Sequence, residues 1–279
     1  MVRIVTDTTS SLPRQLAEEY DIPVLPQIII FGEESYRDDT ELDTFAFLER
    51  LRASPALPKT AAPPPALYHP IFERLLAEAD TVICLHPSAD LSGTVRSANV
   101  ARQDFPGADI RVIDTRTTAG PLATMVILAA RWAREGVDAD TIVARVHDLI
   151  HSQRVYFVVD TLEYLHKGGR IGGAQALLGG LLRVKPILTL EDGRVQPFEQ
   201  QRTARRALAR LRELVLEQCP PRDESHLCVM HADAHAQARA LADGFAVQLG
   251  LSDVPIYLLP PAIVVHGGPG LLAVGFFAP

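Results

Sequence analysis

The first half of the chain alternates short apolar, β-branched runs with segments whose apolar residues recur at the spacing of a helix face. Such alternation is typical of βαβ units, in which a helix connects two parallel strands. It predicts a mostly parallel sheet covered by helices. The predicted strands are Val2–Val5, Val24–Phe31, Thr81–Leu85 and Ile110–Ile113, and the predicted helices begin after Pro13 and at Asp43, Pro65, Thr94 and Thr118.

The second half has a different pattern. Asp192-Gly193 separates the runs Ile187–Leu190 and Val195–Phe198, and this dipeptide favours the tight turn of an antiparallel hairpin. Further along, the pattern predicts helices over 203–217 and 234–249, a strand over 227–230 and short terminal strands. Because 279 residues suffice for two cores, we predict an N-terminal α/β domain over residues 1–155 and a C-terminal α/β domain with a mixed sheet over residues 156–279.

The last part of the chain imitates a membrane span. Residues 256–279 contain no Lys, Arg, Asp or Glu, and this stretch is longer than the ~20 residues that a span needs. Pro260-Pro261 and Gly267–Gly270 divide it into pieces of a few residues. Short pieces of this kind suit buried strands joined by turns. We therefore predict no transmembrane segment.

Composition and charge narrow the classes of partner. The chain has 27 Lys and Arg against 34 Asp and Glu, a formal charge of −7, which opposes binding to phosphate backbones and predicts no nucleic-acid partner. Cys84, Cys219 and Cys228 are widely spaced in or beside apolar stretches, as reduced core thiols are. The N-terminus lacks the pattern of a signal peptide. We expect a cytoplasmic protein.

Hydroxyl groups follow one of the predicted parallel strands. Ser88–Thr94 lies between the strand 81–85 and a helix, at the edge of the sheet where ligands of α/β proteins bind. Backbone N–H groups at such a helix start, together with the hydroxyls of Ser92 and Thr94, suit an anionic group. A simple helix N-cap at Ser92 or Thr94 explains the same residues equally well.

A glycine-rich segment, His166–Gly173, offers backbone close to a ligand and a forked cation in Arg170. It matches neither the dinucleotide nor the P-loop pattern, and neither occurs elsewhere in the chain. The following residues, Ala174–Leu182, predict a helix that is apolar on nearly all sides. Such a helix is buried in a domain interface or forms the wall of an apolar cavity.

Histidines and arginines leave further alternatives open. His266 lies in the charge-free terminal run beside several glycines, and it is either a core residue or part of a ligand site. The pairs His147 and His151, and His231 and His235, have no local third ligand, so we predict no metal site. A basic helix carries either a solvated face or a docking face for an acidic partner. Its arginines are Arg202, Arg205, Arg206, Arg210 and Arg212.

Taken in order, these motifs resemble the DegV family, whose members include the fatty-acid-binding subunit (FakB) of bacterial fatty acid kinase. The resemblance runs nearly end to end, and it is the order of the motifs that makes it specific. The motifs are Val5–Ser10, Thr60 before Pro63, Leu91–Thr94 with Ser97-Ala98, Asp114-Thr115, Asp160–Ile171 and His266–Gly270.

The resemblance implies two α/β domains that hold a long-chain fatty acid between them. It also implies a binding subunit that is not itself an enzyme and needs no cofactor. This subunit presents the carboxylate to the catalytic subunit of a fatty acid kinase, which forms the acyl phosphate. Transient contact with a membrane is compatible with this role. The implied carboxylate ligands are Thr60, Ser92, Arg170 and His266. The residues expected to line the acyl tunnel are Leu177, Leu178 and Leu181. The residues expected to dock onto the kinase are Arg202 and Arg205.

Two departures from the family pattern concern the head group. Ala61 stands where the family usually has serine, and Asp90 stands where it usually has glycine, so we expect one hydroxyl fewer and a negative charge near the carboxylate. Two other functions stay open. One is an acyl hydrolase with Ser92 as nucleophile, His266 as base and Asp7 or Asp114 as orienting group. The other is a sugar-phosphate or nucleotide-binding module, which predicts a polar pocket.

Overall fold

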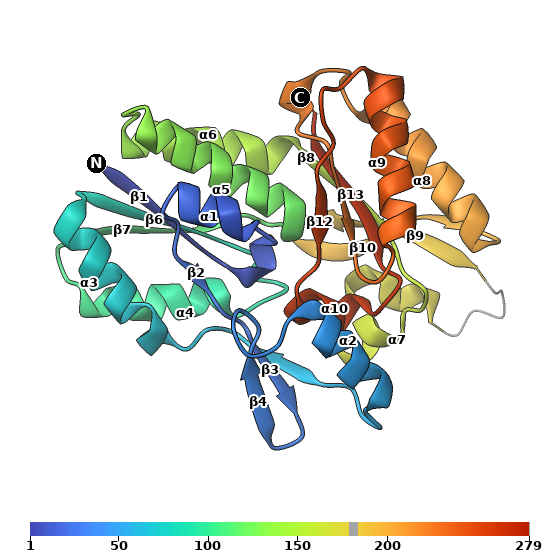
Figure 1. Cartoon of the computed structure of the whole chain (residues 1–279), viewed down its shortest axis with the longest axis horizontal. Coiled ribbons are helices and arrows are strands. Elements are labelled where there is room, and N and C mark those ends of the chain that lie inside the picture. The colour runs from blue at the N-terminus through green and yellow to red at the C-terminus, as the bar shows by residue number, and fades with distance from the viewer. Residues whose placement is uncertain (179–183, 279) are drawn as a thin grey trace.

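The computed structural model describes residues 1–178 and 184–278, which form an α/β structure with two larger sheets side by side (Figure 1). The N-terminal sheet is parallel, as the sequence predicts. Its strands, in the order β2-β1-β6-β7, are β1 (Val2–Asp7), β2 (Val24–Leu25), β6 (Thr81–His86) and β7 (Asp109–Asp114). Every residue of the central strand β6 is buried, because helices cover both faces of the sheet.

Two apolar clusters fix the helices on this sheet. Ile4 and Ile83 pack with α5 and α6 on one face, whereas Val82 and Cys84 pack with α3 and α4 on the other. The alternation follows from the period of two along a strand. The bounds are α3 (His69–Glu78), α4 (Thr94–Ala101), α5 (Ala119–Arg134) and α6 (Ala139–Ser152), with the short helix α1 (Arg14–Glu19) near β1 in sequence.

The C-terminal sheet is mixed, with strand order β10-β9-β8-β13-β11-β12. Its strands are β8 (Gln153–Val158), β9 (Lys185–Glu191), β10 (Arg194–Gln201), β11 (Cys228–His231), β12 (Ile256–Leu258) and β13 (Leu272–Phe277). The predicted hairpin is confirmed: β9 and β10 pair antiparallel, and Asp192 and Gly193 both have positive φ in the turn. The predicted division between residues 155 and 156 falls within β8 and stays a prediction.

The two faces of the mixed sheet have different neighbours. Tyr156 and Val274 face α8 (Ala204–Gln218) and α9 (His235–Leu249) on the outer side. Val155 and Phe157, one residue away on β8, belong instead to a cluster with α2 (Thr44–Ala53), α5 and α10 (Pro261–Gly267). This inner cluster lies between the two larger sheets, so side chains from both halves of the chain meet there.

Several predicted elements were wrong in form. The run 24–31 is two strands, since Pro26 cannot donate to a ladder. The second of them joins a three-stranded antiparallel sheet made of β3 (Ile28–Phe31), β4 (Glu34–Arg37) and β5 (Lys59–Ala61). Thr60 therefore lies in a strand of this small sheet.

The terminal run also differs from the prediction. Pro261 does not break the chain but opens α10, because proline suits the first turn of a helix, where its missing N–H has no partner to lose. The predicted helix Ala174–Leu182 is instead a 3-10 helix over Gly172–Leu177 that follows α7 (Glu163–Lys167), and residues 179–183 lie outside the described part of the chain. Among the described residues, no helix combines the length and apolarity needed to cross a bilayer.

Candidate functional site

A pocket lies between the two larger sheets and contains about 850 Å³ of empty space, including the solvent at its mouth. Residues from both halves of the chain line it. They are Thr9, Gln27, Thr60, Pro87, Leu91, Ser92, Thr118, Ala119, Val155, Phe157, Leu165, Arg170, Leu190, Val195, Met230, Leu259, Ala262, Ile263, His266, Gly267, Leu271 and Ala273.

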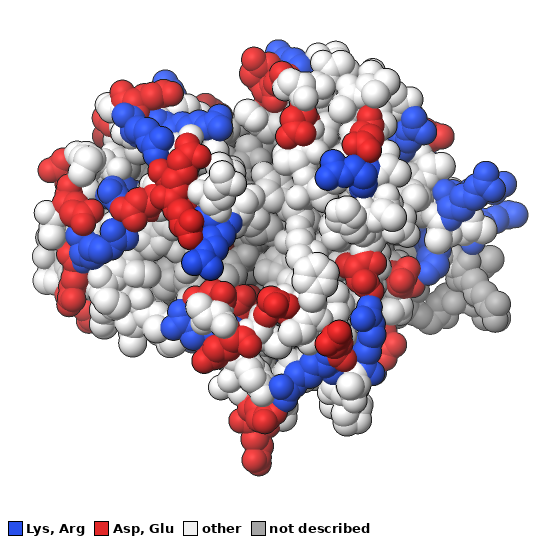
Figure 2. All heavy atoms as spheres, in the orientation of Figure 1, with Lys and Arg blue, Asp and Glu red and all other residues white. Residues whose placement is uncertain are grey.

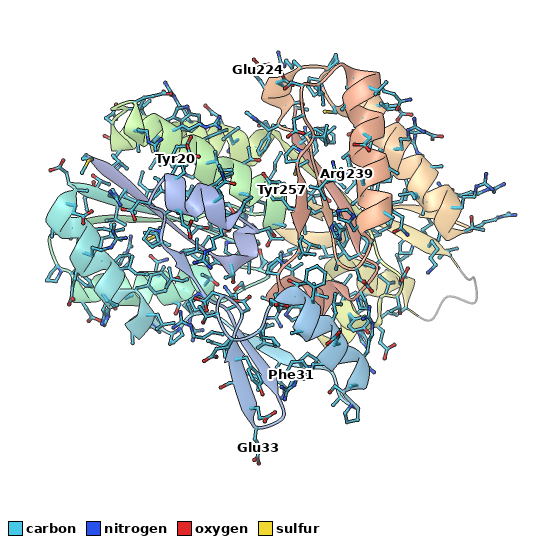
Figure 3. The ribbon with its side chains drawn as sticks, viewed as in Figure 1. Tyr20, Phe31, Glu33, Glu224, Arg239 and Tyr257 are labelled. Carbon is cyan, nitrogen blue, oxygen red and sulfur yellow. The ribbon has the colours of Figure 1, made fainter. Side chains whose placement is uncertain are left out.

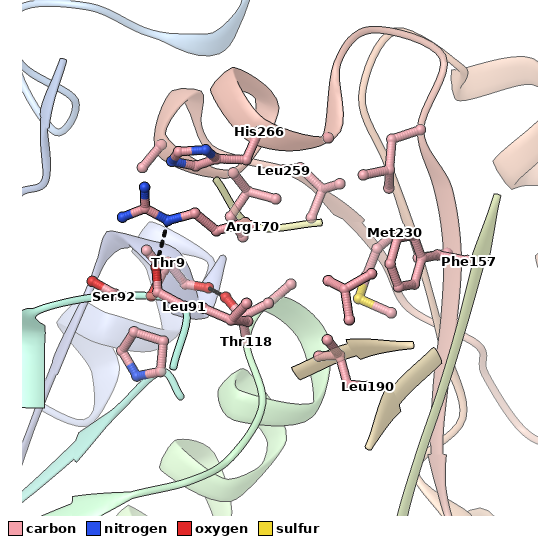
Figure 4. Close-up of a pocket in the computed structure, with 18 of the residues that line it drawn as sticks. Thr9, Leu91, Ser92, Thr118, Phe157, Arg170, Leu190, Met230, Leu259 and His266 are labelled. Atoms are coloured by element: carbon pink, nitrogen blue, oxygen red, sulfur yellow. Dashed lines mark hydrogen bonds between the residues drawn. The ribbon is translucent and has the colours of Figure 1, made fainter. Parts of the chain in front are cut away.

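The two ends of the pocket differ in polarity (Figure 4). Ser92, Arg170 and His266 lie at one end, which we call the polar end. Phe157 and Met230 lie at the other, which we call the apolar end. A pocket divided in this way is matched to an amphipathic ligand with one polar head and an apolar tail.

Thr60 and His266 meet at the polar end although they are 206 residues apart in the chain. The distance from Thr60 Oγ1 to His266 Nε2 is 2.9 Å, and the buried Nδ1 of His266 has no hydrogen-bond partner among the described residues. Burial, reinforced by the positive charge of Arg170, lowers the pKa of His266 to about 4, so the ring is neutral at pH 7. A buried N–H without an acceptor is rarer than an unused lone pair. We therefore assign the hydrogen to Nε2, which donates it to Thr60 and leaves the Thr60 hydrogen free for a ligand.

Main-chain carbonyl groups hold Arg170 in place. Its Nε donates to the carbonyl oxygen of Leu91 at 3.0 Å and its Nη1 to that of Gly168 at 2.7 Å (Figure 4 marks the first). No acidic side chain forms an ion pair with Arg170 within the described ranges. Three of its five N–H groups thus have no partner among the residues that the structure describes, and a bound anion would be the counter-charge.

Ser92 lies just before α4. The helix has Gly93 as its N-cap and makes no side-chain cap bond there, so neither Ser92 nor Thr94 is the N-cap residue that the sequence left open. Ser92 Oγ instead lies 2.8 Å from Thr94 Oγ1 and accepts the backbone N–H of Thr94 at 3.3 Å. Ser92 is only partly buried and faces the pocket, whereas Thr94 is fully buried behind it.

The family model described as "Uncharacterised protein, DegV family" matches residues 1–279. The chain belongs to the DegV family. It is 36% identical to a DegV domain-containing protein of Halalkalibacterium halodurans, over 99% of this chain and 98% of that protein. It is 38% identical to one of Streptomyces coelicolor, over 98% of this chain and 97% of that protein.

Solved structures of DegV proteins have the same fold. One, described as showing fatty acid binding of a DegV family protein from Thermus thermophilus, matches with a TM-score of 0.91 and 32% identity, over 100% of this chain and 99% of that one. Another, described as a fatty acid binding DegV family protein from Streptococcus agalactiae, matches with a TM-score of 0.90 and 30% identity at the same coverage. The expected fold class, α/β with a parallel-sheet part and a mixed-sheet part, is confirmed.

In this DegV chain the four predicted carboxylate ligands, Thr60, Ser92, Arg170 and His266, all line the polar end, and their binding role stays a prediction. The predicted tunnel lining is placed differently. Leu177 is partly buried against the inner cluster, Leu178 is 37% exposed, and neither lines the pocket. Leu181 lies outside the described residues.

Sequence reasoning missed most of the pocket's apolar surface. Phe157 and Leu190 come from β8 and β9, and which face of those strands meets a cavity depends on the packing of the sheets. Gln27 was missed as well, since it follows Pro26 in a stretch predicted as an ordinary strand.

Asp90 does not bring an unpaired charge to the polar end. Its carboxylate pairs with Arg194 at 2.9 Å and with Arg116 at 3.3 Å, and the bond from Arg194 lowers the pKa of Asp90. The hydroxyl of Ser88 donates to the carbonyl oxygen of Gly193 at 2.7 Å. The loop before α4 is thus tied to the turn of the β9–β10 hairpin, so Asp90 joins the two halves of the chain.

The groups proposed for an acyl hydrolase are engaged with other partners. His266 Nε2 contacts Thr60, and Ser92 Oγ contacts Thr94. Asp7 lies against His86 Nδ1 at 2.8 Å. The carboxylate of Asp114 accepts two backbone N–H groups. The described contacts therefore contain no hydrogen-bonded triad of nucleophile, base and acid.

The two remaining kinds of site are a polar-ligand pocket and a metal site. The mostly apolar lining does not fit the polar pocket of a sugar-phosphate or nucleotide module. Within the described ranges, no group of three or more His, Cys, Asp or Glu could hold a metal ion.

Gly168 gives His266 its space. A Cβ atom at this position would lie 2.3 Å from His266 Nδ1, so the imidazole must move if Gly168 is replaced. We expect Gly168→Ala to separate His266 from Thr60 and to weaken ligand binding about 3- to 10-fold, the effect of one hydrogen bond. The loss of affinity is measured by equilibrium binding of a fatty acid to the parent and to the variant. Gly244→Ala in α9, where the added Cβ meets nothing within 4 Å, is the control. Equal affinity in both variants would contradict the prediction.

The depressed pKa of His266, about 4, has a consequence for stability. In the unfolded chain the ring takes its proton near pH 6.5, so between these values the unfolded state binds more protons. Stability is therefore lost as the pH falls from about 6.5 towards 4. We expect the lipid-free variant His266→Gln to lose free energy of unfolding less steeply than the parent across this window, measured by denaturant titration. Burial raises the pKa of Asp38 to about 7, so this carboxyl group makes the protein more stable as the pH falls. Its contribution is the same in the parent and in the variant. Identical slopes would show that His266 is not buried in its neutral form.

Proposed function

We propose that the protein binds a long-chain fatty acid, with its carboxylate at the polar end of the pocket and its acyl chain along the apolar end. The observation that carries the proposal is the convergence of Thr60, Ser92 and Arg170 at one end of a mostly apolar pocket. A buried carboxylate is tolerated only where it is paired and hydrogen-bonded, and two hydroxyls with a guanidinium supply that.

The acyl chain supplies the affinity in this proposal. Each buried methylene contributes ~0.8 kcal/mol, so a dozen give an upper limit near ~10 kcal/mol before the costs of binding. The related structures from Thermus thermophilus and Streptococcus agalactiae, both described as fatty acid binding, support the same class of ligand. So does a structure described as DegV, a fatty acid binding protein from Bacillus subtilis, which matches with 29% identity.

We further propose that the protein is a carrier, and that a separate kinase subunit phosphorylates the bound carboxylate. The absence of a nucleotide-binding motif from the sequence supports a division in which the partner supplies nucleotide and metal. The proposal places both proteins in the cytoplasm. Because the acyl chain is poorly soluble in water, we propose that the carrier takes up and releases the fatty acid during transient contact with a membrane surface.

The start of α8 is the proposed docking face for the kinase. Arg210 is committed to Glu199, Glu213 and Glu217. No ion pair is found for Arg202 or Arg205, which are exposed, in the part of the chain that the structure describes. Basic side chains gather at the right-hand edge of Figure 2, where α8 lies in Figure 1. Uncommitted cations of this kind attract an acidic partner surface.

Reversing these two charges tests the docking face. We expect the double variant Arg202→Glu, Arg205→Glu to bind fatty acid as the parent does but to serve a fatty acid kinase at least about 10-fold less well, because like charges now face each other. Acyl-phosphate formation at subsaturating carrier concentration measures this. The control is Arg239→Glu, which reverses the charge of an exposed arginine of α9 (Figure 3) and is expected to leave acyl-phosphate formation unchanged. A double variant that serves the kinase fully would exclude docking through this face.

The proposal as a whole rests on one direct measurement. Native mass spectrometry of the purified protein, followed by solvent extraction, is expected to find a co-purified fatty acid at one molecule per chain. Protein that carries none and also fails to bind added fatty acids would refute the proposal and leave the family likeness as a likeness of fold.

A further inference from the structure

A row of polar side chains runs from Ser92 to the buried Asp7, and one of its members, Gln27, also lines the pocket. Thr94 Oγ1 lies 2.8 Å from Ser92 Oγ, Gln27 Nε2 lies 2.9 Å from Thr94 Oγ1, and the same Nε2 lies 3.0 Å from Asp7 Oδ1. Asp7 and Thr94 are 0% exposed and Gln27 is 2% exposed. We call Asp7, Gln27, Thr94 and Ser92 the relay. Its members come from β1, the residues between β2 and β3, and the region where α4 begins.

The direction of the relay is set at Asp7. Oδ1 of this carboxylate accepts the backbone N–H and the hydroxyl of Thr9 as well as the bond from Gln27. Since a carboxylate oxygen offers only lone pairs here, the Gln27 atom that faces it must be the amide nitrogen. The second hydrogen on this nitrogen goes to Thr94 Oγ1, which is therefore an acceptor.

The same reasoning orients the two hydroxyls. Thr94 Oγ1 accepts from Gln27, so its own hydrogen needs an acceptor, and Ser92 Oγ is the remaining oxygen within hydrogen-bond distance among the described residues. Ser92 Oγ also accepts the backbone N–H of Thr94 at 3.3 Å. With its lone pairs engaged in this way, Ser92 directs its own hydrogen into the pocket. A buried network in which every member is satisfied specifies one arrangement of hydrogens.

We propose that Gln27 and Thr94 are positioning residues that fix Ser92 as a hydrogen-bond donor and thereby select an anionic head group over a neutral one. This inference rests on the proposed fatty acid binding. A carboxylate has two oxygens and no hydrogen, so it accepts from Ser92, Thr60 and Arg170 together. The single oxygen of a fatty alcohol has two lone pairs, so it cannot accept from all three donors.

Thr94→Val tests the relay, because valine keeps the shape of threonine and removes its hydroxyl. The measured quantity is the ratio of the affinities for a fatty acid and for the fatty alcohol of the same chain length. We expect Thr94→Val to reduce this ratio about 3- to 10-fold, since Ser92 is then free to rotate and accept from the alcohol. Thr94→Ser, which restores a hydroxyl, is expected to retain the parent ratio. A Thr94→Val protein that binds both ligands equally more weakly would overturn the proposal.

A second variant and a control separate positioning from folding. Gln27→Met removes the donor that orients Thr94 and is expected to lower the same ratio, so the relay remains testable if Thr94→Val does not fold. The control is Thr6→Val: Thr6 is also 0% exposed, but its hydroxyl donates to the carbonyl oxygen of Leu85, outside the relay. We expect Thr6→Val to reduce stability and to leave the ratio of the two affinities unchanged. A reduced ratio in Thr6→Val would contradict the proposal, because the loss in the relay variants would then follow from general destabilisation.

The two proposals fail in different ways in this experiment. A parent protein that binds neither the acid nor the alcohol refutes fatty acid binding itself. A parent that prefers the acid, with variants at Thr94 and Gln27 that keep the same preference, refutes only the relay and leaves fatty acid binding intact.

Discussion

Arg170→Met is expected to weaken fatty acid binding about 30- to 5,000-fold. The guanidinium is held by the carbonyl oxygens of Leu91 and Gly168, and it is the one cation that lines the polar end within the described residues. Without it, the carboxylate of the ligand would be buried against neutral hydroxyls alone. Truncating one partner of a buried, hydrogen-bonded charge pair costs about 2 to 5 kcal/mol, and this gives the expected range.

Titration calorimetry or displacement of a fluorescent fatty acid measures this loss. Arg205→Met makes the same change at an exposed arginine and is expected to leave binding unchanged, provided that no kinase is present. Arg170→Lys keeps the charge but loses the fork that reaches both carbonyl oxygens, so an intermediate affinity is expected. An Arg170→Met protein that unfolds at the parent temperature and binds fatty acid as tightly as the parent would show that the carboxylate lies elsewhere.

Leu190→Trp is expected to shorten the longest fatty acid that the pocket accepts. Leu190 lies on β9 at the apolar end (Figure 4) and is only partly buried, so a larger ring there meets less resistance than in the closed core. Each methylene that the ring displaces forfeits ~0.8 kcal/mol, or about fourfold in affinity. If three or four are displaced, the longest acids lose about 100-fold while shorter acids bind as before.

A series of saturated fatty acids of increasing length, each titrated into parent and variant, measures the effect. The short acids are an internal control for folding, because they do not reach the ring. Leu208→Trp makes the same change on α8, on the outer side of the mixed sheet, and is expected to leave the whole series unchanged. A uniform loss at every chain length in Leu190→Trp would mean that the acyl chain does not run towards Phe157 and Met230 (Figure 4).

The elements that the sequence predicts well are those whose signal is local. The β-branched runs at 81–85 and 110–113 became parallel strands, and Asp192-Gly193 became the turn of a hairpin, because period and turn chemistry depend on neighbouring residues. The split after Pro26 and the helix opened by Pro261 were missed. Both depend on which partner the segment packs against, and proline permits either outcome in an apolar run.

The candidate site divides in the same way. By itself, the sequence determined the parallel and mixed sheets, the family, and the motifs that carry Thr60, Ser92, Arg170 and His266. Only the tertiary structure decided that β5 and α10 bring Thr60 within 2.9 Å of His266, and that Asp90 turns to Arg194. It likewise decided the direction of the Ser92 hydroxyl. The reason is physical: hydrogen bonds, charge pairing and desolvation depend on distances between segments far apart in the chain, and no local pattern contains those distances.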